Sequence, residues 1–308
     1  MPDTSPSLDA AVTLLRSHPD YRVLTRIPER THYAAPGDTG ERTVRKGVIL
    51  DTETTGKTAG KDKIIELGMV AFEYDAETGE AFRILDTFNQ LEDPGMPIPP
   101  EATAVNGITD EMVQGKQIDD DAVAAFLKDA SLIVAHNARF DRGFCEVRFP
   151  VFEDYAWSCS FEEVAWDEEG LGSAKLEFIA YKFGLFYDAH RAEADCRALL
   201  EILQHPLPNS GTPALKSLAE FVNRSTCTIR ALNSPFSTKD ALKGRGYRWD
   251  SEVRTWHTTV LTRAAMEEEI AWLKENVYGG KTATLEFEVS DAMNRYSGRP
   301  GKVQAKHY

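Results

Sequence analysis

The stretch GVILDTETTG at residues 47–56 decides how this chain is interpreted. A short apolar run leads directly into Asp51 and then Glu53, which are followed by two threonines and a glycine. Side chains two positions apart on a strand point to the same face, so these carboxylates project together, about 7 Å apart along the backbone. Such like charges repel each other unless a cation lies between them. The stretch therefore predicts a cation site, although two acids in an ordinary polar turn are the alternative.

Oxygen ligands alone favour hard ions such as Mg²⁺ or Mn²⁺, which also bind phosphate groups. The small residues Thr54, Thr55 and Gly56 predict a turn that lets a ligand or another backbone approach closely. We therefore expect divalent cations of this kind as cofactors at the end of the strand.

The composition is that of a globular protein with one large or two smaller domains in 308 residues. No apolar run approaches the ~20 residues that span a bilayer, and the N-terminus lacks the basic and apolar regions of a secretory signal. The four cysteines show no C-x-x-C spacing and predict reduced thiols rather than a zinc site. These features predict a cytoplasmic protein with no membrane partner.

The charge is unevenly distributed along the chain, whose net charge is −14. Residues 1–213 hold 20 Lys and Arg against 38 Asp and Glu, or −18. Residues 214–308 hold 15 against 11, or +4. An acidic part that holds cations and a mildly basic part that meets an anion would explain this division. Solvated surface charge is the alternative.

The order of elements predicts a mixed α/β fold in which antiparallel strands precede an alternation of strands and helices. The expected strands cover residues 46–50, 64–75, 81–91 and 131–137, and the expected main helices cover 138–149, 173–184 and 192–204. The Pro- and Gly-rich stretch HPLPNSGTP at 205–213 predicts a domain boundary. We expect an N-terminal helical extension and linker (1–46), a first domain (47–205), a linker (206–213) and a small α+β domain (214–308).

Two further polar constellations follow the first. In VAHNARFD a strand ends at His136–Asn137 and a helix begins, so Asn137 is a candidate N-cap and Asp141 lies one turn in. In HRAEADC, His190 precedes a helix whose early turns carry Asp195. Taken singly, Asp141 could merely complement a helix dipole and His190 could be a cap or surface residue.

Taken together, the three stretches resemble the DEDD exonuclease superfamily in the subgroup with a histidine in its last motif. The resemblance rests on D-x-E at 51–53, H-N-x-x-F-D at 136–141 and H-x4-D at 190–195, and it covers roughly residues 47–205. NGITDEMV at 106–113 resembles a segment that this family places beside the substrate's 3′ end. The most similar group is the bacterial DNA polymerase III epsilon-like exonucleases with an added C-terminal domain.

The resemblance implies an RNase H-like fold, two divalent cations and 3′–5′ hydrolysis of single-stranded nucleic acid, preferably DNA, to nucleoside 5′-monophosphates. It implies that Asp51 bridges both ions, that Glu53 and Asp195 complete one site and that Asp141 serves the other. His190 would act as general base, since its ordinary pKa near 6.5 suits that role. A DNA polymerase or a repair protein is an implied candidate partner.

The residues around these motifs are candidates for gripping the terminal nucleotide, either through backbone groups or through apolar contact with a base or sugar. Some of them could equally be core residues. The candidate substrate-binding residues are Thr52, Thr54, Thr55, Ile108, Asn137 and Phe140.

The C-terminal part predicts a strand at 226–233, a hairpin at 247–260, a helix at 262–278 and a last strand at 282–289. Cations and aromatics interleave along the hairpin, which could stack and neutralise a single strand. Alternatively, the tryptophans fill a small core and the arginines lie on the opposite face. The candidate nucleic-acid contacts are Arg245, Arg248, Trp249, Arg254 and Trp256.

Two other functions share much of this pattern. An exoribonuclease that trims RNA ends would keep the same motifs, because the metals act on phosphate rather than on the sugar. A non-catalytic nucleic-acid or polymerase accessory module would be favoured if any of the five motif residues were missing, and none is.

Overall fold

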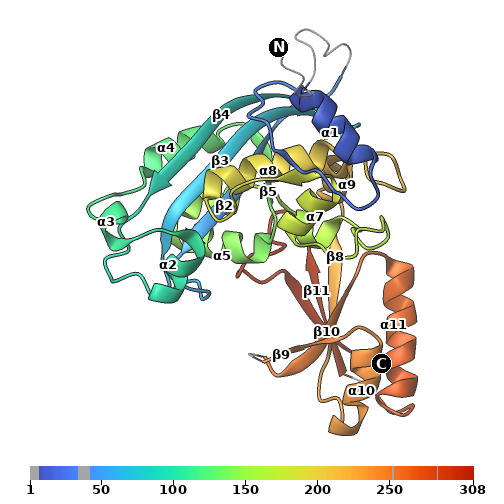
Figure 1. Ribbon diagram of the computed structural model, residues 1–308. Coiled ribbons are helices and arrows are strands. Elements are labelled where there is room, and N and C mark those ends of the chain that lie inside the picture. The colour runs from blue at the N-terminus through green and yellow to red at the C-terminus, as the bar shows by residue number, and fades with distance from the viewer. Residues whose placement is uncertain (1–6, 34–41, 252, 283) are drawn as a thin grey trace, which may run out of the picture.

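The computed structural model describes residues 7–33, 42–251, 253–282 and 284–308 (Figure 1). Residues 1–6 and 34–41 of the predicted N-terminal extension and linker (1–46) lie outside the described residues. Two five-stranded sheets form the framework of the molecule. None of the helices in the described ranges has the length and apolar character needed to cross a membrane.

The larger sheet has the order β4-β3-β2-β5-β6, with antiparallel pairing through β4, β3 and β2 and parallel pairing from β2 to β5 and β6. This mixed arrangement is the RNase H-like α/β class that the sequence predicts. The central strand β2 is longer than the expected 46–50, so Asp51 and Glu53 lie within the strand rather than beyond its end. The strands are β2 (Val44–Thr54), β3 (Ile64–Asp75), β4 (Ala81–Leu91), β5 (Ala130–Ala135) and β6 (Trp157–Cys159).

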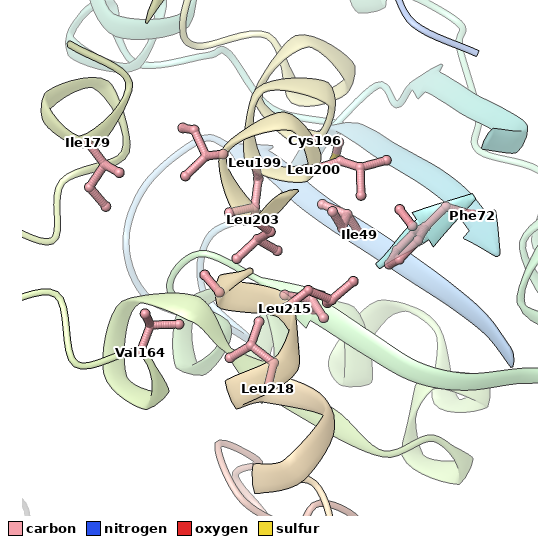
Figure 2. Close-up of a cluster of buried hydrophobic side chains, with 14 of the residues drawn as sticks. Ile49, Phe72, Val164, Ile179, Cys196, Leu199, Leu200, Leu203, Leu215 and Leu218 are labelled. Carbon is pink, nitrogen blue, oxygen red and sulfur yellow. The ribbon is translucent and has the colours of Figure 1, made fainter. Parts of the chain in front are cut away.

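Helices cover both faces of this sheet because the side chains of β2 alternate between two cores. Ile49 faces a cluster with helices α7, α8 and α9, whereas Val48 and Leu50 face a cluster with α4 and α5. Figure 2 shows the first cluster, in which leucines of α8 and, lower in the view, of α9 gather with Ile49 and Phe72. The helices are α4 (Asp120–Leu127), α5 (Ala138–Arg148), α7 (Leu176–Lys182), α8 (Ala192–Gln204) and α9 (Ala214–Phe221).

Short elements complete this part of the chain. Strand β1 pairs in parallel with β7 and ties the N-terminal region to the segment before α8. Cys145, Cys159 and Cys196 are buried as free thiols, and Cys227 is partly buried. The short elements are α1 (Leu8–Ser17), β1 (Thr25–Arg26), α2 (Pro100–Asn106), α3 (Asp110–Val113), η1 (Pro150–Asp154), α6 (Ser160–Glu163) and β7 (Leu185–Phe186).

The smaller sheet has the order β12-β11-β8-β10-β9 and is entirely antiparallel. The predicted hairpin at 247–260 is β9 and β10, but the expected last strand is followed by a further one, β12, which the alternation did not reveal. A core between the sheet and its helices includes Ile229, Leu273 and Leu285. The elements are β8 (Thr226–Ala231), η2 (Phe236–Thr238), α10 (Lys239–Gly244), β9 (Arg248–Asp250), β10 (Thr255–Val260), α11 (Arg263–Asn276), β11 (Thr284–Ser290) and β12 (Lys302–His307).

Segments from beyond the predicted boundary at 206–213 contribute to the larger sheet's core. Leu215 and Leu218 of α9 lie in the cluster of Figure 2, and Tyr296 lies in the cluster on the opposite face. We call residues 291–299, which connect β11 to β12, the clamp segment. The two sheets are thus joined by shared packing as well as by the chain, and the domain boundaries stay a prediction.

Candidate active site

Two of the predicted acids lie on β2, in the middle of the larger sheet. Asp51 and Glu53 are two positions apart and project from the same face of the strand. One carboxylate oxygen of each lies within 4.8 Å of the other and of an oxygen of Asp195, the acid predicted from the third motif. We call Asp51, Glu53 and Asp195 the acidic cluster, since 144 positions separate Asp51 and Asp195 in the sequence but not in space.

Helix α8 brings Asp195 to this place because its N-terminus rests directly on β3. Gly68 is the strand partner of Asp51, and a Cβ at position 68 would lie 2.4 Å from the Ala192 carbonyl carbon. It would also lie 2.5 Å from the Glu193 nitrogen. Only glycine therefore allows the first turn of α8, and with it Asp195, to approach β2 this closely.

Glu66 holds the N-terminus of the same helix, and the sequence analysis missed it. Its side chain is completely buried beneath α8 and accepts hydrogen bonds from Arg191 Nη2 at 2.8 Å and from the Ala192 backbone N–H at 3.3 Å. A buried carboxylate paired with a guanidinium and a helix N-terminus is well satisfied. An acidic residue within the apolar run IIELGMV was the signal that could have identified Glu66.

Asp195 itself is oriented by two donors. Tyr187 donates its hydroxyl to Oδ1 at 3.0 Å, and the Arg191 backbone N–H donates to Oδ2 at 3.0 Å. Tyr187 was also missed, because nothing in its local sequence distinguishes it from a core tyrosine. These bonds fix the carboxylate without neutralising its charge.

Asp141 is buried on the first turn of α5 and is bonded to β2 rather than to solvent. Its Oδ1 accepts from the Thr52 hydroxyl at 2.8 Å and from the Thr52 backbone N–H at 3.1 Å. Asp141 lies beside the acidic cluster but outside the 4.8 Å group. Thr52, predicted to grip a nucleotide, here positions Asp141 through both of its donors.

The electrostatics of these four carboxyls are those of a site that lacks a counter-charge. Burial raises the pKa of Asp51 well above its usual range, and the charges of Asp141, Asp195, Glu53 and Glu66 raise it further. Burial likewise raises the pKa of Glu53 to about 7, although a hydrogen bond from Asn106 opposes it.

The remaining two acids behave in the same way. Burial raises the pKa of Asp141 to about 7 despite its bonds from Thr52. It also raises the pKa of Asp195, although the Tyr187 hydroxyl and the Arg191 N–H lower it. A divalent cation stabilises the charged form of each carboxyl, so this all-oxygen donor set fits a hard ion.

His190 is exposed immediately before α8, and its charge lowers the pKa of Asp195. Its backbone has φ 67°, a left-handed conformation that is uncommon for a residue other than glycine. The chain thus turns sharply at His190 and leaves the imidazole at the border of the acidic cluster rather than in the core.

His136, by contrast, is a structural residue. Its Nδ1 lies 2.8 Å from Ser160 Oγ and its Nε2 lies 2.7 Å from the Ala174 carbonyl, so its ring ties β5 to two later segments. Burial lowers the pKa of His136 to about 4, which keeps the ring neutral near pH 7.

The residues predicted to contact a nucleotide are mostly engaged in the fold. Thr54 donates its hydroxyl to the Gly56 carbonyl at 2.6 Å, and Thr55 Oγ1 accepts from the Lys63 N–H at 3.0 Å. Ile108 is fully buried with Ile65, Ile98 and Val113, so the structure corrects the expectation that it presents surface to a base.

Asn137 and Phe140 differ from these. Asn137 is exposed and occupies the N-cap position of α5 as predicted, but its side chain makes no capping hydrogen bond. Phe140 is partly buried against Phe144, with ring centroids 4.9 Å apart, and keeps some exposed surface. These two side chains keep exposed surface at the start of the helix that carries Asp141.

The predicted contacts in the C-terminal part are divided between two faces of the smaller sheet. Trp256 packs in its core with Trp249 edge-on at 5.5 Å, and Arg245 is held by Glu268 at 2.8 Å and Glu269 at 3.2 Å. Arg248 alternates to the opposite face of β9, and Arg254 is exposed at the hairpin turn with φ 53°. Trp256 in the core and Arg248 on the opposite face fit the structural alternative, whereas Trp249 is 50% exposed and stays a candidate contact.

Comparison with known proteins agrees with this geometry. The profile of the exonuclease family RNase_T matches residues 48–203. The chain is 29% identical over 197 residues to DNA polymerase III subunit epsilon of Treponema pallidum, covering 58% of this chain and 88% of that protein. It is 32% identical over 169 residues to DNA polymerase III PolC-type of Clostridium perfringens, covering 51% of this chain but only 11% of that protein.

Among solved structures, exonuclease X in complex with 5′-overhanging duplex DNA is 25% identical, with a TM-score of 0.40, over 55% of this chain and 99% of that one. The zinc-bound complex of E. coli ExoI with single-stranded DNA is 16% identical, with a TM-score of 0.49, over 75% of this chain and 71% of that one. The family profile spans half of the chain and all five motif residues. The chain therefore belongs to the exonuclease family, as a 3′–5′ exonuclease of the DEDD type.

Proposed function

We propose that the protein hydrolyses single-stranded DNA from its 3′ end and releases nucleoside 5′-monophosphates with the help of two Mg²⁺ or Mn²⁺ ions. The observation that carries this proposal is the acidic cluster, with Asp141 beside it and no basic partner for its charge within the cluster. Four carboxyls with raised pKa values around one point fit divalent cations and a phosphate, not a neutral ligand.

Asp51, Glu53 and Asp195 would hold one ion, and Asp51 with Asp141 would hold the other. Bound there, the ions would stabilise charge on the leaving 3′ oxygen and lower the pKa of the attacking water. Tyr187 and the Arg191 N–H keep Asp195 aimed at the cluster, and Thr52 does the same for Asp141. Most of the protein's contribution is thus preorganisation of carboxylates.

His190 would accept the proton of the attacking water. It is exposed beside Asp195, whose pKa it lowers, so it can reach solvent and the cluster alike. A histidine side chain at such a border can take a proton from water and pass it to solvent, as a general base does. Asn137 and Phe140, which lie at the start of α5 near Asp141 in the sequence, would contact the terminal nucleotide.

The preference for DNA and a polymerase partner rest on the relatives, which are named as DNA polymerase III proteins. We propose both for this chain on that ground alone. The hydrolytic chemistry does not depend on either, because the carboxylates act at the phosphate.

The experiment that tests the proposal compares 5′-labelled and 3′-labelled single strands of DNA and of RNA, with Mg²⁺ or with EDTA. We expect a 5′-labelled DNA ladder that shortens stepwise, immediate release of the 3′ label as a mononucleotide, and no reaction in EDTA. Faster RNA degradation would overturn the preference for DNA. Cleavage of a closed circular single strand would overturn the exonuclease assignment itself.

A further inference from the structure

The smaller sheet is fixed rigidly beside α5, the helix that carries Asp141. Arg142 is completely buried and donates from Nη1 to the carbonyls of Ala292 at 3.1 Å and Arg295 at 2.8 Å. Its Nη2 donates to the Met293 carbonyl at 2.5 Å. The clamp segment therefore holds the end of β11 against the residue that follows Asp141.

The face of this sheet opposite its helices carries a row of basic side chains. In the register of the strands, Arg248 of β9 pairs with His257 of β10, and His257 pairs with Arg230 of β8. Neighbours in register on adjacent strands lie on the same face. Trp256 and Ala231 lie in the helix-covered core, so the row lies on the other face.

A third arginine reaches this row from α5, a helix that packs on the larger sheet. Arg139, on the first turn of α5, lies with its guanidinium 5.6 Å from the ring centroid of Tyr296 in the clamp segment. Burial lowers the pKa of His257, and the guanidiniums of Arg230, Arg139 and Arg248 lower it further, while Asp250 opposes them. Arg139, Arg230 and Arg248 thus gather around His257. Arg139 lies two positions before Asp141 on α5.

The arginines of the row differ in how their charge is used. Arg230 is committed to Glu286 at 3.1 Å and Glu288 at 2.6 Å. Arg139 and Arg248 are exposed, and neither forms an ion pair with any residue that the structure describes. The charge of Arg139 also acts on Glu288, but neither guanidinium is held in a direct ion pair within the described residues, so both are free to contact an anion.

We propose that Arg139 and Arg248 bind the phosphate backbone of the substrate strand a few nucleotides from the 3′ end that the acidic cluster receives. This inference rests on the proposed function. Residues 1–213 carry −18 and repel a polyanion everywhere except at the bound cations, so a longer strand needs cations next to the site. The row supplies them next to the first turn of α5, where Arg139 approaches His257.

The test measures binding separately from cleavage, with Ca²⁺ in place of Mg²⁺ to suppress hydrolysis. The dissociation constant of a 20-nucleotide single strand is measured against KCl concentration for the wild type, Arg248→Ala and Arg139→Ala/Arg248→Ala. Each phosphate contact contributes about 0.7 to the salt slope of a single strand, so the double variant should lose about 1.4 and bind roughly tenfold more weakly at 0.1 M salt.

Arg263→Ala is the matched control, because this arginine is exposed at the start of α11, on the covered side of the sheet. It removes the same charge, so an equal loss of slope in the control would show a general charge effect and overturn the proposal. An unchanged slope in the double variant would also overturn it. Arg248 lies on an edge strand, away from the clamp segment. Arg248→Ala alone should therefore lower the salt slope by about 0.7, even if Arg139→Ala disturbs the packing of Tyr296.

Hydrolysis of a dinucleotide distinguishes this inference from the proposed function. A dinucleotide is too short to reach the row, so the variants should cleave it at the wild-type rate. Failure of the wild type to cleave it would overturn the proposed function, while the salt slopes would still decide the role of the two arginines.

Discussion

The acidic cluster and the contacts of the clamp segment are two groups of buried charged side chains. They differ in whether each charge has an oppositely charged or polar partner within the chain. In the clamp, Arg142 meets three carbonyls and Glu146, and Arg295 meets Glu163 at 3.1 Å, so each buried charge has a partner within the chain. In the acidic cluster, like charges face one another and every pKa is raised.

The pairing of buried charges therefore distinguishes a structural polar core from a functional one. A buried charge that is paired within the fold supports one specific packing arrangement. Removing its partner lowers the free energy of unfolding by several kcal/mol. A buried charge that the fold leaves repelled destabilises the chain until a ligand satisfies it. On this account, variants in the two groups should have opposite effects on the metal-free protein.

The largest effect is expected from Asp51→Asn. Several kcal/mol of transition-state stabilisation depend on cations held at this position, so the rate of hydrolysis should fall by about 10³-fold or more. The metal-free variant should nevertheless unfold at the same or a higher temperature, because one repelled charge is gone. Steady-state rates and thermal melts in EDTA measure the two quantities. A near wild-type rate would remove the cluster from the chemistry.

Arg142→Met should have the opposite profile in the clamp. It removes a buried guanidinium with its four hydrogen bonds to Glu146 and to the carbonyls of Ala292, Met293 and Arg295, so the free energy of unfolding should fall by about 3 kcal/mol or more. Arg263→Ala, on an exposed surface pair, should change it by less than about 0.5 kcal/mol. Denaturant unfolding curves compare the two. Equal, small losses would mean that the clamp contributes little to stability.

The pH dependence of Glu53→Gln sharpens the comparison further. The pKa of Glu53 is raised to about 7 in the folded chain, against an ordinary value near 4.3. Protonation therefore favours the folded state, and the wild type loses this stability as pH rises from about 4 to about 7. The glutamine variant does not titrate there.

In EDTA, Glu53→Gln should thus gain stability relative to the wild type over this pH window, by roughly 1 kcal/mol or more at pH 8. Saturating Mn²⁺ should remove or reverse the gain. Unfolding curves at pH 4.5, 6 and 8 measure it. A difference that stays constant across the window would show that Glu53 is not repelled in the folded chain.

The smallest effect is expected from Tyr187→Phe, which removes one hydrogen bond to Asp195. Such a bond to a charged group contributes about 1.5 to 3 kcal/mol at most, and part of it is recovered by water. Asp195 should then hold its cation less firmly, and the Mn²⁺ concentration for half-maximal rate should rise several-fold. An unchanged metal requirement would limit Tyr187 to a packing role.

Sequence reasoning identified the main strands and helices and the acids, because both have local signals. The alternation of β3 and β4 and the period of α8 are explicit in the residues, and the three motifs carry Asp51, Glu53, Asp141, His190 and Asp195. It could not identify the clamp, since Arg142 and Ala292 are 150 positions apart and no local pattern relates them.

The residues that support the site were missed for a similar reason. Glu66 and Tyr187 act through contacts made only when α8 lies on β3, and a strand pattern does not show which neighbour covers it. The predicted contacts on the hairpin stay a prediction, but arginines and tryptophans that alternate along a strand lie on opposite faces of it. Arg248 and Trp249 therefore cannot act on one surface.

The most direct test of the central claim is a calorimetric titration of Mn²⁺ into the metal-free protein at pH 7, without nucleic acid. Glu53 and Asp141, with pKa values of about 7, are partly protonated there, so binding should be saturable and should release protons. Repetition in two buffers of different ionisation enthalpy measures that release. The account predicts that Asp51→Asn abolishes both binding and proton release. Equal affinity and equal proton release in the wild type and in Asp51→Asn would contradict it.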